Sequence, residues 1–174
     1  MILQDIYLKC ETGEIVGMLG RNGCGKSSLM KILFGSLKGE SQSVRIDGRY
    51  VLRLFEDRNA ISFMPQEGFA MNYLTVDQLI DIFCSQEAKE QILQIGDIQK
   101  HRELKIGNLS TGIRKLTEVL VILYSRSKFV ILDEPFSFLS PVLTEQVIIH
   151  IRQQSEQKGI FLTDHLFQHV FDVC

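Results

Sequence analysis

Residues 18–35, MLGRNGCGKSSLMKILFG, place a glycine-rich turn between two apolar runs. Within it, Gly20, Gly25, Lys26 and Ser27 fill the fixed positions of the pattern G-x-x-x-x-G-K-[ST]. A turn of this kind leaves backbone N–H groups bare and lets them converge on an anion. The pattern therefore predicts a phosphate-binding loop, in preference to an ordinary strand–turn–helix connection with surplus glycine.

The flanks of this loop supply the context that the pattern requires. Residues 14–19, EIVGML, are typical of a buried strand, and residues 27–37, SSLMKILFGSL, have the spacing of a helix that tolerates Gly35 near its end. A helix that begins here directs its free N–H groups and the positive end of its dipole at the phosphates.

Apolar strands alternate with helical segments along the rest of the chain. We expect strands, in chain order, within residues 2–10, 43–55 (two short runs broken at Asp47-Gly48), 60–64, 129–133 and 160–165. We expect helices within residues 75–95, 107–125 and 143–158, the last closed by Gly159. This alternation predicts a parallel sheet covered on both faces, with ligands bound at the carboxyl ends of its strands.

Composition limits the class of protein. The chain has 174 residues, of which 45% are hydrophobic and 23% are charged, and this predicts one domain with a substantial core. Its net charge of −2 gives no general attraction to nucleic acid or anionic lipid. The scattered cysteines favour a reducing compartment, and no apolar run reaches the length of a transmembrane helix. We therefore expect a cytoplasmic protein, or one that reaches a membrane only through a partner.

Two acids end the apolar run in residues 129–135, FVILDEP. Asp133, at the end of the expected strand, can steady a Mg²⁺ ion held by Ser27 and by the β- and γ-phosphates of a nucleotide. Glu134 then directs a second carboxylate at the water that attacks the γ-phosphate, as a general base. In isolation the same two acids could simply cap the following turn, but a phosphate loop in the same chain favours the metal and base roles.

Five short motifs in a fixed order make the chain resemble an ATP-binding cassette (ABC) ATPase over nearly its whole length. Besides the phosphate loop and FVILDEP, residues 109–115, LSTGIRK, resemble the family signature. Gln66 in FMPQEG falls where the family has its Q-loop glutamine, and His165 in LTDH falls where it has its switch histidine.

This resemblance implies the α/β fold of a P-loop NTPase. Its parts would be a mostly parallel sheet covered by helices, a small N-terminal antiparallel β part and an inserted helical subdomain near residues 68–125. Together they would form a single nucleotide-binding domain over residues 1–174.

The resemblance also implies roles for individual residues, with ATP and Mg²⁺ as cofactors. The residues expected to hold the nucleotide from the loop side are Gly20, Arg21, Asn22, Gly23, Cys24, Gly25, Lys26, Ser27 and Ser28. Ser110 and Gly112 would act in trans, on ATP bound to the opposite protomer of a head-to-tail dimer. The expected metal ligands are Ser27, Gln66 and Asp133. The expected catalytic residues are Glu134, which polarises the water, His165, which contacts the γ-phosphate, and Gln66.

The chain departs from the family pattern at several points. Thr111 and Ile113 replace a glycine and a glutamine of the signature, and Ser140 stands where an aspartate is usual. Both ends are shorter than the family pattern, and the adenine-stacking aromatic that normally precedes the phosphate loop has no clear counterpart. Tyr7 is the only candidate, although its neighbours align better with the following strand.

We therefore expect an ATP-hydrolysing subunit of an ABC transporter, which powers solute movement through ATP-driven dimerisation. Its partners would be a second copy or a paired ABC subunit, and a membrane-spanning permease subunit at the inner face of the membrane. Two alternatives remain: a soluble ABC protein that acts on DNA or ribosomes, and a nucleotide-binding regulator with little turnover. The chain lacks the sustained heptads, second cassette or basic patch typical of the former, so no nucleic-acid partner is expected.

Overall fold

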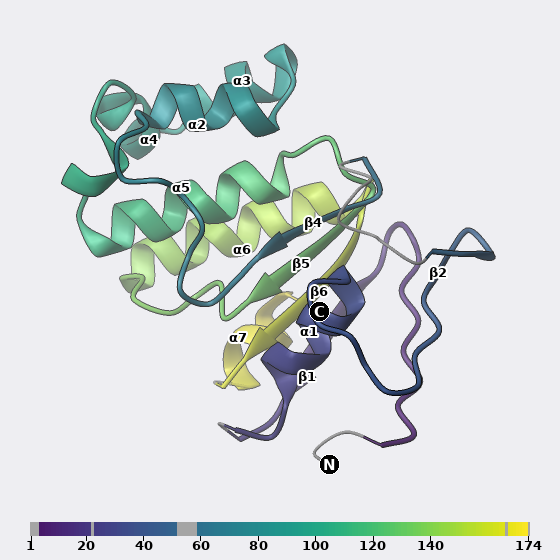
Figure 1. Cartoon of the computed structure of the whole chain (residues 1–174). Coiled ribbons are helices and arrows are strands. Elements are labelled where there is room, and N and C mark those ends of the chain that lie inside the picture. Colours follow the sequence, from purple (N-terminus) through teal and green to yellow (C-terminus); the bar gives the residue numbers. More distant parts are fainter. Residues whose placement is uncertain (1–3, 22, 52–58, 166, 174) are drawn as a thin grey trace.

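The computed structural model describes residues 4–21, 23–51, 59–165 and 167–173. Its centre is a four-stranded sheet in the order β1-β6-β5-β4, with all neighbouring strands parallel (Figure 1). The strands are β1 (Ile15–Leu19), β4 (Ile61–Met64), β5 (Phe129–Asp133) and β6 (Gly159–Asp164). The strand before the phosphate loop and the strand that carries Asp133 therefore both flank β6, which brings motifs distant in sequence to one edge.

Side chains along each strand alternate between two cores, one on each face of the sheet. On one face, Met30 of α1 (Lys26–Phe34) packs with Ile61, Ile131 and Phe161. The opposite face contributes the intervening apolar residues to the larger core, namely Met64, Val130, Leu132, Ile160 and Leu162. Burial on both faces explains why these strands are almost continuously apolar in sequence.

The helices cover the two faces unequally. The second face carries α5 (Thr111–Leu123), α6 (Pro141–Ser155) and α7 (Phe167–Val173), whereas α1 lies on the first. An outer layer over α5, seen at the top of Figure 1, consists of α2 (Val76–Phe83), α3 (Gln86–Leu93) and α4 (Gly96–His101), followed by the 3-10 turn η2 (Ile106–Asn108). Within the described ranges, no helix combines the length and apolarity needed to cross a bilayer.

Helix α5 is enclosed on every side. All residues from Lys115 to Leu123 are buried, because the sheet, α6 and α2 pack around it. Such enclosure normally requires an apolar helix. Lys115, Thr117 and Glu118 are nevertheless among the buried residues, so their polar groups must find partners inside the protein.

The small antiparallel part of the fold is a hairpin, and the expected strand at 2–10 does not join it. β2 (Arg45–Ile46) pairs with β3 (Arg49–Tyr50) around Asp47 and Gly48, whose φ angles of 50° and 77° are those of a tight hairpin turn. Residues 4–10 form no strand, so that prediction is wrong for the described part of the segment. Leu8 and Cys10 pack against the smaller core, and Tyr7 is exposed.

Two predicted helix ends are also wrong. Helix α1 stops at Phe34, because Gly35 adopts a left-handed φ of 87° and turns the chain out of the helix. Helix α6 stops at Ser155, and Gly159 is the first residue of β6. Gly159 belongs to β6 because its N–H donates a hydrogen bond to the Lys128 carbonyl, next to the neighbouring strand β5.

Candidate functional site

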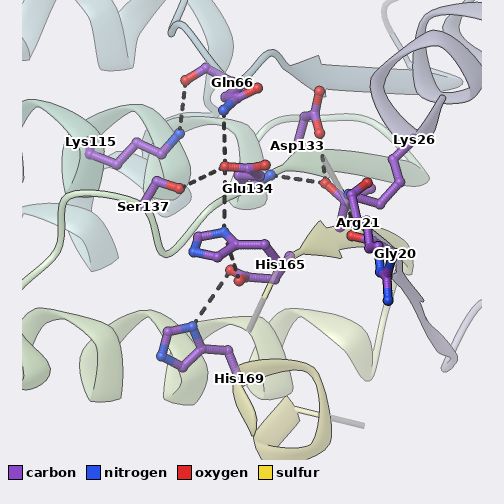
Figure 2. Close-up of polar contacts among 12 residues, drawn as sticks. Gly20, Arg21, Lys26, Gln66, Lys115, Asp133, Glu134, Ser137, His165 and His169 are labelled. Atoms are coloured by element: carbon purple, nitrogen blue, oxygen red, sulfur yellow. Dashed lines mark hydrogen bonds and ion pairs between the residues drawn. The ribbon is translucent and has the colours of Figure 1, made fainter. Parts of the chain in front are cut away.

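The predicted motifs meet along the carboxyl edge of the sheet, the edge at which parallel sheets bind ligands. The phosphate loop follows β1, Gln66 follows β4, Glu134 follows β5 and His165 follows β6. Figure 2 shows these side chains directed toward one another across the strand ends.

The phosphate loop encloses a buried cation. Gly25 caps the amino end of α1 with a φ of 100°, a conformation that side chains other than glycine rarely adopt. Lys26 is only 7% exposed, and its Nζ donates hydrogen bonds to the carbonyls of Gly20 (2.6 Å) and Arg21 (3.2 Å). The positive charge therefore sits inside the loop, where phosphates would bind.

The remaining predicted loop residues lie in the turn and at the start of α1. Gly23 and Cys24 are exposed in the turn, and Ser27 and Ser28 are half-buried in the first turn of α1. Asn22 lies outside the described residues.

Asp133 is held at the end of β5 by the neighbouring strand. Its side chain is buried, and Thr163 Oγ1 donates to its Oδ1 at 2.6 Å. The parallel register of β5 and β6 places these two residues side by side. A buried carboxylate requires compensation of its charge by nearby polar or positive groups.

Glu134 has a left-handed backbone, with a φ of 51°, which is uncommon for a residue other than glycine. The conformation is supported by its N–H, which donates to the carbonyl of Thr163 (3.2 Å) and to its Oγ1 (3.1 Å). Its Oε2 accepts hydrogen bonds from Gln66 Nε2 and from Ser137 Oγ, each at 3.0 Å. The carboxylate is therefore oriented by groups from β4 and from its own turn (Figure 2).

His165 completes this cluster. Its Nδ1 lies 3.8 Å from Glu134 Oε2 and 3.5 Å from Oδ1 of Asp164, a buried carboxylate at the end of β6. The other oxygen of Asp164 lies 3.6 Å from Nδ1 of His169 on α7. The half-exposed ring of His165 can thus reach both the cluster and solvent.

Ser110 and Gly112 occupy a different place. Ser110 caps α5, and its Oγ accepts from the N–H of Ile113 at 3.4 Å. Gly112 lies against the Phe138 carbonyl and the Leu143 side chain. Among the described residues neither is hydrogen-bonded to the phosphate loop, so the structure does not bring this pair into the same cluster.

Four residues near the site were not assigned roles from the sequence: Lys115, Ser137, Thr163 and His169. Ser137 lies just after the motif FVILDEP, and Thr163 lies inside LTDH, but no spacing in the sequence identified a partner for either hydroxyl. His169 had no clear signal, because His165 was expected at the end of a strand and not on the helix that carries His169. Lys115 had none, because a lysine beside the signature is ordinarily a solvated residue.

Lys115 is the least expected of the four. It is 5% exposed, and its Nζ donates to the Gln66 carbonyl at 3.3 Å. Burial lowers the pKa of Lys115, while the carboxylates of Glu118, Asp133 and Glu134 act in the opposite direction. A second cation thus lies beneath the acidic residues of the site.

These residues fit a nucleotide bound with Mg²⁺. The hydroxyl of Ser27, the amide of Gln66 and the carboxylate of Asp133 offer oxygen ligands, which Mg²⁺ prefers. No group of three or more His, Cys, Asp or Glu side chains suited to a metal occurs within the described part of the chain. A metal here would therefore depend on phosphate oxygens as well as on protein groups.

Comparison with known proteins gives a consistent result. A family model described as ABC transporter matches residues 3–137. Lipopolysaccharide export system ATP-binding protein LptB of Escherichia coli (strain K12) is 29% identical, over 99% of this chain and 78% of that protein. ABC transporter ATP-binding protein YtrB of Bacillus subtilis (strain 168) is 26% identical, over 99% of this chain and 61% of that protein.

Solved structures confirm the fold. An ATP-binding subunit of an ABC transporter superposes with a TM-score of 0.85 at 21% identity, covering 99% of this chain and 77% of that one. The dimeric structure of MJ0796, a bacterial ABC transporter cassette, gives 0.83 at 19% identity, covering 98% and 83%. The predicted α/β fold, with its mostly parallel sheet covered by helices, is therefore correct.

Proposed function

Because the chain belongs to the ABC transporter family, as one of its ATP-binding and ATP-hydrolysing subunits, we propose that it hydrolyses ATP at the carboxyl edge described above. The observation that carries this proposal is the orientation of the Glu134 carboxylate. Its carboxylate is held by Gln66 and Ser137 at the same sheet edge as the buried cation of the phosphate loop. Nothing in the relatives favours the alternative of a regulator with little turnover.

Binding would begin at the phosphates. Lys26 and the backbone N–H groups of Gly23, Cys24 and Gly25 hold the β- and γ-phosphates, and Ser28 lies near the α-phosphate. Ser27, Gln66 and Asp133 would hold Mg²⁺. Bound Mg²⁺ would neutralise charge that develops on the phosphate oxygens.

Hydrolysis would then depend on the position of one water molecule. Glu134 accepts a proton from this water as the oxygen attacks the γ-phosphate, with the ADP β-phosphate oxygen as leaving group. Gln66 and Ser137 keep the carboxylate aimed, which limits the reorganisation needed in the transition state. His165, next to Glu134, contacts the γ-phosphate.

Assembly would complete the site. Because Ser110 and Gly112 lie away from their own phosphate loop, we propose that they cover ATP bound to a second protomer related by a two-fold axis. Residues 1–174 would act as one cassette with the helical subdomain near 68–125. A membrane-spanning partner would hold the protein, in the cytoplasm, at the inner face of the membrane.

Phosphate release by the purified chain tests the hydrolysis proposal. Mg²⁺-dependent release is expected, and Lys26→Ala should abolish it because the cation inside the loop is lost. Lys100→Ala, which removes an exposed lysine of α4, is the matched control and should release phosphate at the normal rate. Normal release by Lys26→Ala, or none by the unaltered chain at high concentration, would contradict the proposal.

A further inference from the structure

Side chains of α5 form hydrogen bonds with the backbone that follows Gln66. The buried carboxylate of Glu118 accepts hydrogen bonds at Oε1 from the N–H groups of Phe69 (3.3 Å) and Ala70 (3.1 Å). Both donors belong to the irregular segment between β4 and α2, where the sheet and helices offer them no ladder. Glu118 thus accepts the backbone hydrogen bonds that the carbonyls of a neighbouring strand would accept in a sheet.

Arg114, one helical turn earlier, holds the same segment from the outside. Its Nη1 donates to Asn72 Oδ1 at 2.8 Å, and its Nη2 donates to the Ala70 carbonyl at 2.9 Å. Its Nε lies 3.3 Å from Glu118 Oε1, so the partly exposed guanidinium pairs with the buried carboxylate. A buried carboxylate needs such a partner.

Lys115 holds the first residue of the segment. Its Nζ donates to the carbonyl of Gln66, the residue whose side chain donates to Glu134 (Figure 2). Arg114, Lys115 and Glu118, which we call the clamp, together contact the backbone or side chains of residues 66–72 at five points.

Gly68 shows how closely the clamp fits. Its φ of +84° is left-handed, and a Cβ placed there would lie 2.4 Å from Glu118 Oε2 and 2.8 Å from Oε1. A side chain at this position would therefore displace the carboxylate. The contact between this segment and α5 therefore leaves no space for even a methyl group at residue 68.

From these contacts we infer that the clamp is a positioning device, in which Lys115 and Glu118 set the place of Gln66 and, through it, the orientation of Glu134. The inference rests on the proposed function. The clamp also attaches segment 66–72 to the helix that begins directly after Ser110.

Turnover of paired variants tests the positioning role. Lys115→Met removes the donor to the Gln66 carbonyl but keeps the length of the side chain. We expect kcat to fall between about tenfold and a hundredfold, as for other misplaced catalytic groups, with KM for ATP nearly unchanged because the phosphate loop is intact. Lys115→Arg should restore most of the rate, and Lys128→Met, which removes a partly exposed lysine away from the site, should have no effect.

Epistasis separates positioning from general damage. In a Gln66→Ala background, Lys115→Met should lower kcat no further, since the group through which it acts is gone. Equal losses in both backgrounds, or no loss in either, would overturn the inference. Gly68→Ala supplies a second route, because it displaces Glu118 without removing a charge, and it should show the same loss and the same epistasis.

Amide hydrogen exchange tests the clamp independently of turnover. Glu118→Ala should raise exchange at Phe69 and Ala70 by about tenfold or more, the effect of losing a buried hydrogen bond to a charged acceptor. Unchanged exchange at these two amides would overturn the clamp even in an active enzyme. Faster exchange in a chain that never releases phosphate would instead contradict only the proposed function.

Discussion

At the residue scale, the orientation of the Glu134 carboxylate depends on a hydroxyl three positions further along the chain. Ser137 Oγ and Gln66 Nε2 both donate to Oε2, so each contributes to the aim of the carboxylate. A hydrogen bond to a charged group contributes about 1.5 kcal/mol or more. Removing one of the two should leave Glu134 in place but less well ordered.

We therefore expect Ser137→Ala to lower kcat by roughly tenfold while KM for ATP stays nearly constant. Steady-state phosphate release over a range of ATP concentrations measures both. Ser155→Ala is a matched control, because it removes an exposed hydroxyl at the end of α6 that bonds only locally. A rise in KM without a change in kcat would mean that Ser137 serves nucleotide binding.

At the element scale, the amino end of β6 carries a buried charge far from the site. Lys158, just before β6, is 8% exposed, and its Nζ donates to the Ser125 carbonyl. Burial lowers the pKa of Lys158 from 10.5 to about 8. Above that pH the folded protein binds fewer protons here than the unfolded chain, so raising the pH favours folding through this group.

The unfolding free energy of the unaltered protein minus that of Lys158→Met should therefore become about 1 kcal/mol more positive between pH 8 and pH 9. Denaturant unfolding of both proteins at the two pH values measures it. Burial raises the pKa of Cys10 to about 11 and that of Cys84 to about 12, which opposes the trend in each protein but cancels in the difference. A difference independent of pH would show that Lys158 titrates normally.

At the scale of the whole molecule, we propose that a second chain completes the active site. Ser110 and Gly112 form an N-terminal helix turn that contacts the Phe138–Leu143 region rather than the phosphate loop. Thr111, Ile113 and Ser140 depart from the family pattern in these same regions. Ser140 nevertheless caps α6, since its Oγ accepts from the N–H of Leu143. Serine at position 140, where the family usually has aspartate, therefore still caps the amino end of α6.

Glu134→Gln should trap an ATP-bound dimer, because the amide keeps the shape of the side chain but cannot accept the proton from water. Light scattering with and without Mg-ATP measures the mass of the particle, at protein concentrations well above the dissociation constant of the dimer. Ser110→Arg in the same background should prevent the dimer by placing a bulky side chain at the covering turn. If Glu134→Gln stays monomeric, and Ser110→Arg in a chain with Glu134 intact leaves partner-stimulated turnover unaltered, the shared-site proposal is wrong.

Local features of the sequence determined much of this protein. The phosphate loop, the order of the motifs and the apolar strands within 14–19, 60–64, 129–133 and 160–165 could be predicted, because turn chemistry and periodicity are properties of consecutive residues. Parallel strands joined by helices bring their carboxyl ends together. The pattern therefore predicted ligand binding at this edge, whereas the roles of Gln66 and His165 were implied by the resemblance to the ABC family.

The tertiary structure decided which of these features found partners. Residues 4–10 alternate like a strand but pair with none of the strands that the structure describes, whereas Gly159 joins β6 because the Lys128 carbonyl accepts its N–H. Gln66 and Glu134, 68 positions apart, and Lys115 and Gln66, 49 apart, meet only after the sheet and α5 have packed. A hydrogen bond between distant residues leaves no trace in local periodicity, because its geometry is created by the burial that brings the two groups together.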